Sequence, residues 1–396
     1  MKKSLLYALA LSASLPVMAQ EEKKEEQGFV FTTVKENPIT PVKNQNRSGT
    51  CWSFSGLGFL ESELLRMGKP ETDLSEMFVV YHSYSDKADK FVRMHGTVNF
   101  AGGGSFHDVL YTLKHYGAVP ETAYTGLNYG ESKHVHNEMD GLTKAYVDQV
   151  ITTKGTLTPV WKKGFDGILN AYLGELPETF KVDGKEYTPQ SYAQSLGLNA
   201  DDYVSITSYT HHPFYTQFAL EIPDNWRWGT SYNVPLEEMS EIADNAIKNG
   251  YTIAWGADVS EKGFNRNGIG VLPDVEGLEL SGSDAARWLG LSQKEKDEEI
   301  KKLAGGPCKE ISVTQESRQK GFDNYETTDD HGMVIYGIAN DQTGKKYYMI
   351  KNSWGETGKY KGFWYISEPF FQAKTMNFVV HKDALPKKIA KKLGIK

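Results

Sequence analysis

A helix pattern that begins at a cysteine constrains the fold of this chain more than any other feature. From Cys51 to about Met67, apolar residues recur at helical spacing, and Gly68 ends the pattern; the stripe is Phe54, Leu57, Leu60, Leu64 and Leu65. Peptide dipoles and free N–H groups at a helix N-terminus favour an anion. The sequence therefore predicts a helix that presents Cys51 in a setting that lowers the pKa of its thiol.

The later part of the chain has the pattern of strands rather than helices. Helices are predicted at about 105–116, 164–174, 189–196 and 235–249, with a charged surface helix at about 284–304. Strands are predicted at 251–259, 333–338, 346–351 and 363–366, and residues 341–344 form the turn between the second and third. Helices early and strands late indicate an α+β protein with two lobes.

Polar residues stand where these strands and the cysteine helix would meet. His331 opens the strand at 333–338, and Asn352 follows the end of its partner strand, so the amide could fix the imidazole tautomer. Trp354 would shield the pair from water and is also assigned to substrate binding, and Gln45 could donate to an oxyanion beside Cys51. Alone, each could be an ordinary packing or surface residue. Nucleophile, base, orienting amide and oxyanion donor together indicate amide hydrolysis by a cysteine nucleophile.

Composition excludes several other classes of function. The formal charge of −7 over 396 residues, without a basic stripe before the last sixteen residues, argues against nucleic acid as a partner. Two cysteines cannot form a disulfide framework; Cys308 is expected to be a loop or packing thiol and Cys51 to be free, with a single bridge as the alternative. The pairs His211-His212 and His134-Val-His136 have no cysteine or carboxylate at ligand spacing, so no metal and no cofactor are predicted.

The N-terminus has the pattern of a secretory signal. Lys2 and Lys3 precede an apolar run from Leu5 to Val17 and a small-residue cleavage site at Ala19. The run is shorter than the ~20 residues that a membrane span needs. We therefore expect residues 1–19 to be removed, residues 20–28 to be a disordered spacer, and the protein to be exported to the periplasm or secreted without a membrane span.

The motifs Ser48-Gly-Thr-Cys-Trp52 and Asn352-Ser-Trp-Gly355 resemble those of the papain-like cysteine peptidases. The resemblance implies a helical lobe and a β-barrel-like lobe, with Cys51 as nucleophile, His331 as base, Asn352 as orienting residue and Gln45 as oxyanion donor. It also implies that Gly103 and Gly104 bind the substrate main chain. On residue pattern alone, Gly102-Gly-Gly104 could equally be a flexible turn.

The chain departs from ordinary members of that family in its length. The stretch between Cys51 and His331 is about twice the usual gap of roughly 130–150 residues. We assign the peptidase domain to 29–372, with a helical lobe at about 45–120, an insertion at about 121–235, and a β-rich lobe at about 236–372 that carries a helical insertion at about 280–305.

Long insertions and the segment Trp255-Gly-Ala-Asp-Val259 are similar to the bleomycin hydrolase and aminopeptidase C branch. That branch implies an aminopeptidase, a homo-hexamer, and a C-terminal arm in the cleft that restricts cleavage to the substrate N-terminus. The basic tail at 373–396 lacks the usual closing sequence of the branch; it is predicted to be either a solvated tail on an acidic surface or a short amphipathic helix carrying Leu385, Ile389 and Leu393.

Three other functions stay open on sequence alone. A papain-like endopeptidase would have an open cleft, and a non-catalytic homologue would only bind peptides. A transglutaminase-like acyl transferase also uses cysteine and histidine, but normally with an aspartate in the place of Asn352. The sequence favours peptide hydrolysis, with a peptide as the expected partner.

Overall fold

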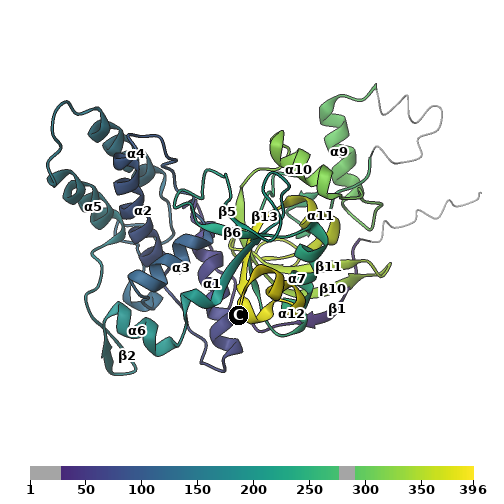
Figure 1. Ribbon diagram of the computed structural model, residues 1–396, viewed down its shortest axis with the longest axis horizontal. Coiled ribbons are helices and arrows are strands. Elements are labelled where there is room, and N and C mark those ends of the chain that lie inside the picture. Colours follow the sequence, from purple (N-terminus) through teal and green to yellow (C-terminus); the bar gives the residue numbers. More distant parts are fainter. Residues whose placement is uncertain (1–27, 276–289) are drawn as a thin grey trace, which may run out of the picture.

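A computed structural model describes residues 28–275 and 290–396. One side of the molecule is built mainly of helices, and the other holds a large sheet with further helices around it (Figure 1). This arrangement confirms the predicted two-lobed α+β fold. No helix among the described residues is both long and apolar enough to span a membrane. The expected signal peptide and most of the spacer lie outside the described residues, so they stay predictions.

The helical lobe is built around the helix that begins at the cysteine. The helices of this lobe are α1 (Cys51–Arg66), α2 (Glu76–Arg93), α3 (Phe106–His115), α4 (Asn137–Thr152), α5 (Val160–Leu173) and α6 (Pro189–Leu196), with a hairpin of β2 (Phe180–Val182) and β3 (Lys185–Tyr187) and short 3-10 turns at Glu121–Ala123 and Ala200–Asp202. Residues Trp52 to Leu64 of α1 are all buried, so α1 is the central helix of this lobe. Ser75 caps α2 by accepting a hydrogen bond from the Phe78 N–H group.

The second lobe is one extended sheet with helices around it. Its strands are β1 (Phe31–Glu36), β4 (Tyr203–Thr207), β5 (Gln217–Ala219), β6 (Thr230–Asn233), β7 (Ile253–Ala257), β8 (Phe264–Asn265), β9 (Ile269–Gly270), β10 (His331–Asp341), β11 (Lys346–Lys351), β12 (Phe363–Ser367) and β13 (Thr375–His381). The helices are α7 (Leu236–Lys248), α9 (Gln293–Leu303), α10 (Gln315–Asp323), α11 (Glu368–Lys374) and α12 (Lys387–Leu393), with a 3-10 turn at Lys382–Ala384.

The sheet is open, whereas the sequence led us to expect a barrel-like lobe. Its order is β5-β6-β4-β13-β7-β10-β11-β12-β9-β8, with β1 paired to β10, and no pairing among the described residues joins the two ends. Many of these strands are only two to five residues long, so they supply too few ladder bonds to continue the curvature around a closed cylinder.

The central strands pack on both faces, which brings the two lobes together. On one face, Ala254, Val334 and Val379 join the core of the helical lobe. On the other, Trp255, Met333 and their neighbours pack against α7 and α11. Successive side chains of a strand point to opposite faces, so β7, β10 and β13 can serve both cores. The lobes therefore share these strands, and α1 lies directly on the sheet.

The C-terminal segment is more ordered than a solvated tail. Of residues 373–396, those from Thr375 to His381 form β13, between β4 and β7, and α12 buries Ile389 and Leu393 in the core beside α7. The last lysine-rich stretch is therefore the amphipathic helix, with its apolar stripe inward, that the sequence offered as one of two alternatives.

Candidate active site

Cys51 is the first residue of α1, at the N-terminus of a helix held against β10. Its carbonyl accepts a hydrogen bond from Ser55 Oγ at 2.6 Å. A β-carbon added to Gly332 would lie 2.6 Å from that same Ser55 Oγ and 3.3 Å from the Phe106 ring. Because a side chain at position 332 would push α1 away from β10, this glycine is what permits the close approach of the two lobes.

His331 and Asn352 form the polar pair that the strand pattern predicted. His331 is the first residue of β10, and Asn352 follows the last residue of β11, to which β10 is paired. Asn352 Oδ1 lies 2.7 Å from His331 Nε2 and also accepts the Ser353 N–H group at 2.7 Å. Because that oxygen is an acceptor in both bonds, Nε2 carries the imidazole proton, and Nδ1 is left as the basic nitrogen.

Trp354 covers this pair. Its ring stacks on His331 with centroids 4.6 Å apart and planes at 28°. Trp364 and Phe264 pack edge-on against Trp354 in turn, at 5.5 and 6.1 Å. Together with the burial of His331 and Asn352, this stacking keeps water from competing for the hydrogen bond between them. The structure thus shows the shielding contact of Trp354; the substrate-binding role assigned from the sequence stays a prediction.

Gln45 is held in place by the segment that carries Asn352. Its backbone N–H donates to the Ser353 carbonyl at 2.8 Å, and its side-chain oxygen accepts from Ser353 Oγ at 2.6 Å. The side-chain NH₂ group is thereby turned away from Ser353. Two residues earlier, Lys43 pairs with buried Glu61 at 2.9 Å and Glu76 at 2.6 Å, which fixes the loop to α1 and α2.

Cys51 and His331 line one narrow cavity between the lobes. Its other lining residues include Trp52, Gly104, Asp224, Asp329 and Gly332. The backbone N–H groups of Gly332 and Trp52 both hydrogen-bond the Cys51 sulfur, and both lower the pKa of its thiol. Since Gly332 directly follows His331 in β10, the thiol of one lobe meets the strand that carries the imidazole of the other.

Considered separately, the Cys51 thiol and the His331 imidazole are each kept neutral by burial. Burial raises the pKa of Cys51 to about 12, and the negative charges of Asp329 and Asp224 add to the rise. Burial also lowers the pKa of His331 to about 4, against the bond from Asn352, which raises it. Transfer of the proton from the sulfur to the imidazole would create two opposite charges that stabilise one another, which would offset the effect of burial on both groups.

The glycine loop lies against the same cavity. Gly104 lines it, and a β-carbon there would lie 2.7 Å from the Trp52 ring. A β-carbon on Gly103 would lie 2.1 Å from a carboxylate oxygen of Asp224. Buried Lys87 donates to the carbonyls of Ala101 and Gly103 and so ties the loop to α2. The loop is tethered rather than a free turn; the substrate contacts of Gly103 and Gly104 stay predictions.

Two acidic residues of this cavity were not found from the sequence. Asp224 belongs to the insertion at 121–235, and only the folded path of that segment brings it to Gly103. Asp329 stands two residues before His331 in the run Asp329-Asp-His331, where an acidic pair beside the predicted base was a signal that could have found it. Burial raises the pKa of Asp329 to about 8, with further contributions from Asp224 and Asp330.

Both cysteines are free, as expected. Cys308 packs beside a small cluster that includes Tyr347, and burial raises the pKa of its thiol to about 11. It is therefore separate from the cavity that Cys51 lines.

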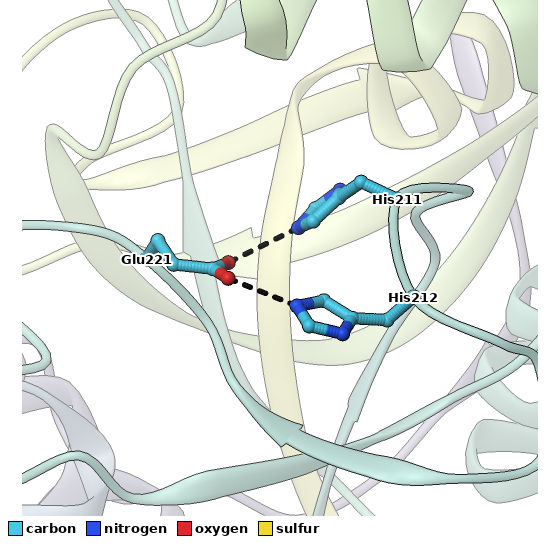
Figure 2. Close-up of side chains that lie close together, drawn as sticks. All are labelled: His211, His212 and Glu221. Carbon is cyan, nitrogen blue, oxygen red and sulfur yellow. Dashed lines mark hydrogen bonds and ion pairs between the residues drawn. The ribbon is translucent and has the colours of Figure 1, made fainter.

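Outside this cavity, the structure changes one expectation about metal. Glu221, which lies beyond β5, contacts both His211 and His212 (Figure 2). Glu221 is nine residues beyond His212, outside the spacing of a local ligand motif, and the chain that contains β5 brings it back to the two histidines.

The chain is similar to known cysteine peptidases along most of its length. Residues 30–163 match the papain family cysteine proteases, and residues 172–277 and 309–395 match the peptidase C1-like family. Aminopeptidase G of Lactobacillus delbrueckii subsp. lactis is 26% identical over 96% of this chain and 89% of its own length. Aminopeptidase C of Streptococcus thermophilus is 23% identical over 96% of this chain and 88% of its own length.

The crystal structure of PepW from Lactobacillus rhamnosis superposes with a TM-score of 0.68 and 20% identity, and the match covers 92% of this chain and 84% of PepW. The fold is therefore shared along nearly the whole chain. With the two family matches and the aminopeptidase relatives, these findings show that the chain belongs to the papain-like cysteine peptidases, in the bleomycin hydrolase and aminopeptidase C branch.

Proposed function

We propose that this cysteine peptidase is an aminopeptidase that acts through Cys51, His331 and Asn352. The observation that carries the mechanism is the bond between His331 Nε2 and Asn352 Oδ1 at 2.7 Å, in the strand pair that meets the cavity of Cys51. That bond leaves Nδ1 as the nitrogen that takes the thiol proton.

The reaction follows from the roles of these groups. His331 takes the proton of Cys51, and the thiolate attacks the scissile carbonyl. The imidazolium then donates the proton to the leaving amine, which departs and leaves an acyl-enzyme on the sulfur. Water, deprotonated by His331, attacks the thioester, and the thiol is regenerated.

Gln45 and the backbone at the start of α1 would stabilise the oxyanion formed in each step. The side-chain oxygen of Gln45 is already used by Ser353, so its NH₂ group is the part that can donate. One preorganised donor of this kind contributes on the order of 3–4 kcal/mol to the transition state.

Aminopeptidase specificity is supported by the relatives, which are named aminopeptidases G, E and C. Among the described residues of the C-terminal segment, Asn377 of β13 lines the cavity, but the chain beyond β13 does not enter it as the expected arm would. Instead α12 packs beside α7, where Asn245 donates to the Ala384 carbonyl at 2.7 Å and Lys392 pairs with Glu238. In the described part of the chain, another feature of the cleft must then exclude longer substrates.

We expect the protein to shorten a free peptide stepwise from its N-terminus and to cut the same peptide with an acetylated N-terminus at least ~100-fold more slowly. Mass spectrometry of a timed digest, with iodoacetamide-treated protein as the control, reads out both rates. Efficient internal cleavage of the acetylated peptide would establish an endopeptidase. Binding without any hydrolysis, or incorporation of an added amine in place of water, would point to a peptide-binding protein or an acyl transferase.

Export and assembly are further proposals. The signal-like residues 1–19 support export to the periplasm or beyond the cell, and the resemblance to the bleomycin hydrolase branch supports a homo-oligomer.

A further inference from the structure

We propose that Asp224 and Asp329 bind the α-ammonium group of the peptide substrate; this inference rests on the proposed aminopeptidase function and names the groups that set its specificity. Both carboxylates line the cavity that contains Cys51 and His331. One comes from the long insertion and the other from the segment that leads into β10.

Asp224 occupies the space beside the glycine loop. The close approach of its carboxylate to Gly103 leaves no room there for even a β-carbon. Asn99 Nδ2 donates to Asp224 Oδ1 at 3.2 Å. The next residue, buried Asn225, donates to the carbonyls of Leu220 and Gly229 at 3.0 and 2.9 Å, so the segment is fixed where it is.

This placement has a steric consequence. If a substrate main chain runs along the glycine loop, Asp224 stands in its path, and the chain must end before it. A peptide that ends there presents its α-ammonium group to the carboxylate. A chain that continues would place an uncharged amide against the carboxylate and would collide with it.

Asp329 adds a second carboxyl group to the same cavity, and because its pKa is raised to about 8, a neighbouring cation would favour its ionised form. Its carboxylate has no hydrogen-bond partner among the described residues, and the charges that act on it are those of Asp224 and Asp330. Asp330 is engaged elsewhere, since it accepts from the Ser260 N–H group at 3.2 Å and from Thr328 Oγ1 at 3.1 Å. Lys87, the cation that acts on Asp224, is already bound to two loop carbonyls. A substrate cation would therefore relieve the repulsion between these carboxylates.

The test compares one fluorogenic amide substrate with a free α-amine and with an acetylated α-amine, in the wild type, Asp224→Asn and Asp329→Asn. We expect each variant to lose ~10- to 100-fold in kcat/KM on the free-amine substrate and to keep or gain activity on the acetylated one, because a charge-assisted bond is lost only in the first case. Asp148→Asn, on the surface of α4, is the matched control and is expected to match the wild type. The rate of Cys51 alkylation shows that the variants keep the active-site fold.

Each outcome has one meaning. If the wild type hydrolyses neither substrate although Cys51 is alkylated at the normal rate, the protein is folded and the proposed function is wrong. Equal losses on both substrates, in variants that alkylate normally, would overturn the ammonium site alone. The wild type could instead prefer acetylated substrates that have lysine or arginine as the second residue before the scissile bond. That result would show that the carboxylates bind a basic side chain of the substrate, and it would also overturn the ammonium site.

A second, independent observation concerns the cluster of His211, His212 and Glu221, and we propose that it binds Zn²⁺. Glu221 Oε2 lies 3.0 Å from His211 Nε2, and Glu221 Oε1 lies 2.9 Å from His212 Nε2. The three side chains converge in Figure 2, and their ligand atoms all lie within 4.8 Å of one another. Ligands of a tetrahedral zinc ion, at about 2.0–2.2 Å from the metal, are about 3.3 Å apart, so small rotations would suffice.

The surroundings hold both rings in orientation. His211 stacks on Phe322 at 5.6 Å and 11°, and His212 stacks on Phe218 at 4.2 Å and 23°. Gln319 lies behind His211, with its amide nitrogen 3.1 Å and its amide oxygen 3.4 Å from Nδ1. When His211 Nε2–H donates to Glu221, Nδ1 accepts a hydrogen bond from the Gln319 amide nitrogen. When Nε2 binds a metal, Nδ1 carries the proton and would donate it to the Gln319 amide oxygen.

Zinc titration of the Cys51→Ser protein by calorimetry tests this site without interference from the nucleophile. We expect one Zn²⁺ to bind with a Kd in the micromolar range or below, and His212→Gln or Glu221→Gln to weaken it at least ~10-fold. His95→Gln, on an exposed loop, is the control. Unchanged zinc affinity in both ligand variants, or no binding to the Cys51→Ser protein, would overturn the proposal.

Discussion

Replacing Cys51 by alanine is expected to lower kcat/KM for peptide hydrolysis by on the order of 10⁴- to 10⁶-fold, the range seen when a covalent nucleophile is removed. The acyl-enzyme cannot form without the sulfur, and the remaining oxyanion donors and binding groups supply only a small residual rate. Initial rates on a free-amine fluorogenic substrate, with enzyme concentration set by active-site titration of the wild type, measure the loss.

The chain offers a matched control for this variant. Cys308 is also a half-buried free thiol whose pKa burial raises, but it packs beside the cluster around Tyr347 and not in the cavity. Cys308→Ser is therefore expected to keep the wild-type rate within about twofold. It should also lose activity on treatment with iodoacetamide, because Cys51 is still present to react. A Cys51→Ala protein that kept a hundredth or more of the activity would show that another group attacks the substrate.

Much of this site could be predicted from the sequence because its parts lie at the ends of regular elements. The apolar stripe after Cys51 predicts α1, and the paired β patterns on either side of the turn at 341–344 bring His331 to Asn352. These local patterns predict the elements correctly because the apolar residues that form them are the ones buried in the core. The order of helices and strands likewise predicts two lobes.

Other features depend on contacts that no local pattern reveals. The helix α2 was not predicted, since it buries Glu76, Ser83 and Lys87 alongside apolar residues, and these polar residues interrupt the apolar stripe. The contact of Asp224 with Gly103 and the return of Glu221 to His211 depend on the path of the long insertion. The place of β13 within the sheet is set by pairing with β4 and β7, which are distant in sequence.

Replacing His331 by alanine is the second change for which we expect a very large effect, with kcat/KM near neutral pH lowered by on the order of 10³- to 10⁵-fold. Burial and the nearby carboxylates raise the pKa of Cys51 to about 12, so at pH 7 a thiol with no base beside it is ionised in about one molecule in 10⁵. In the proposed mechanism the imidazole removes that limit by accepting the proton within the cavity. His95→Ala, on an exposed loop, serves as the control and is expected to retain the wild-type rate.

The pH profile separates loss of the base from simple misfolding. In His331→Ala the thiolate must form by loss of the proton to water, so its fraction, and with it the residual rate, should rise about tenfold per pH unit from pH 7 to 10, below the Cys51 pKa of about 12. In the proposed mechanism the wild-type proton moves between Cys51 and His331, whose pKa values of about 12 and 4 bracket this range, so the pair neither gains nor loses a proton. Asp329, with its pKa of about 8, and the substrate α-amine titrate in both proteins alike, so the ratio of the variant rate to the wild-type rate is the quantity that should rise about tenfold per pH unit. A variant with a flat, uniformly low profile would indicate structural damage, and a variant as active as the wild type would remove His331 from the mechanism. A steep rise with pH would instead show that a buried thiol of high pKa depends on its imidazole partner to react at neutral pH.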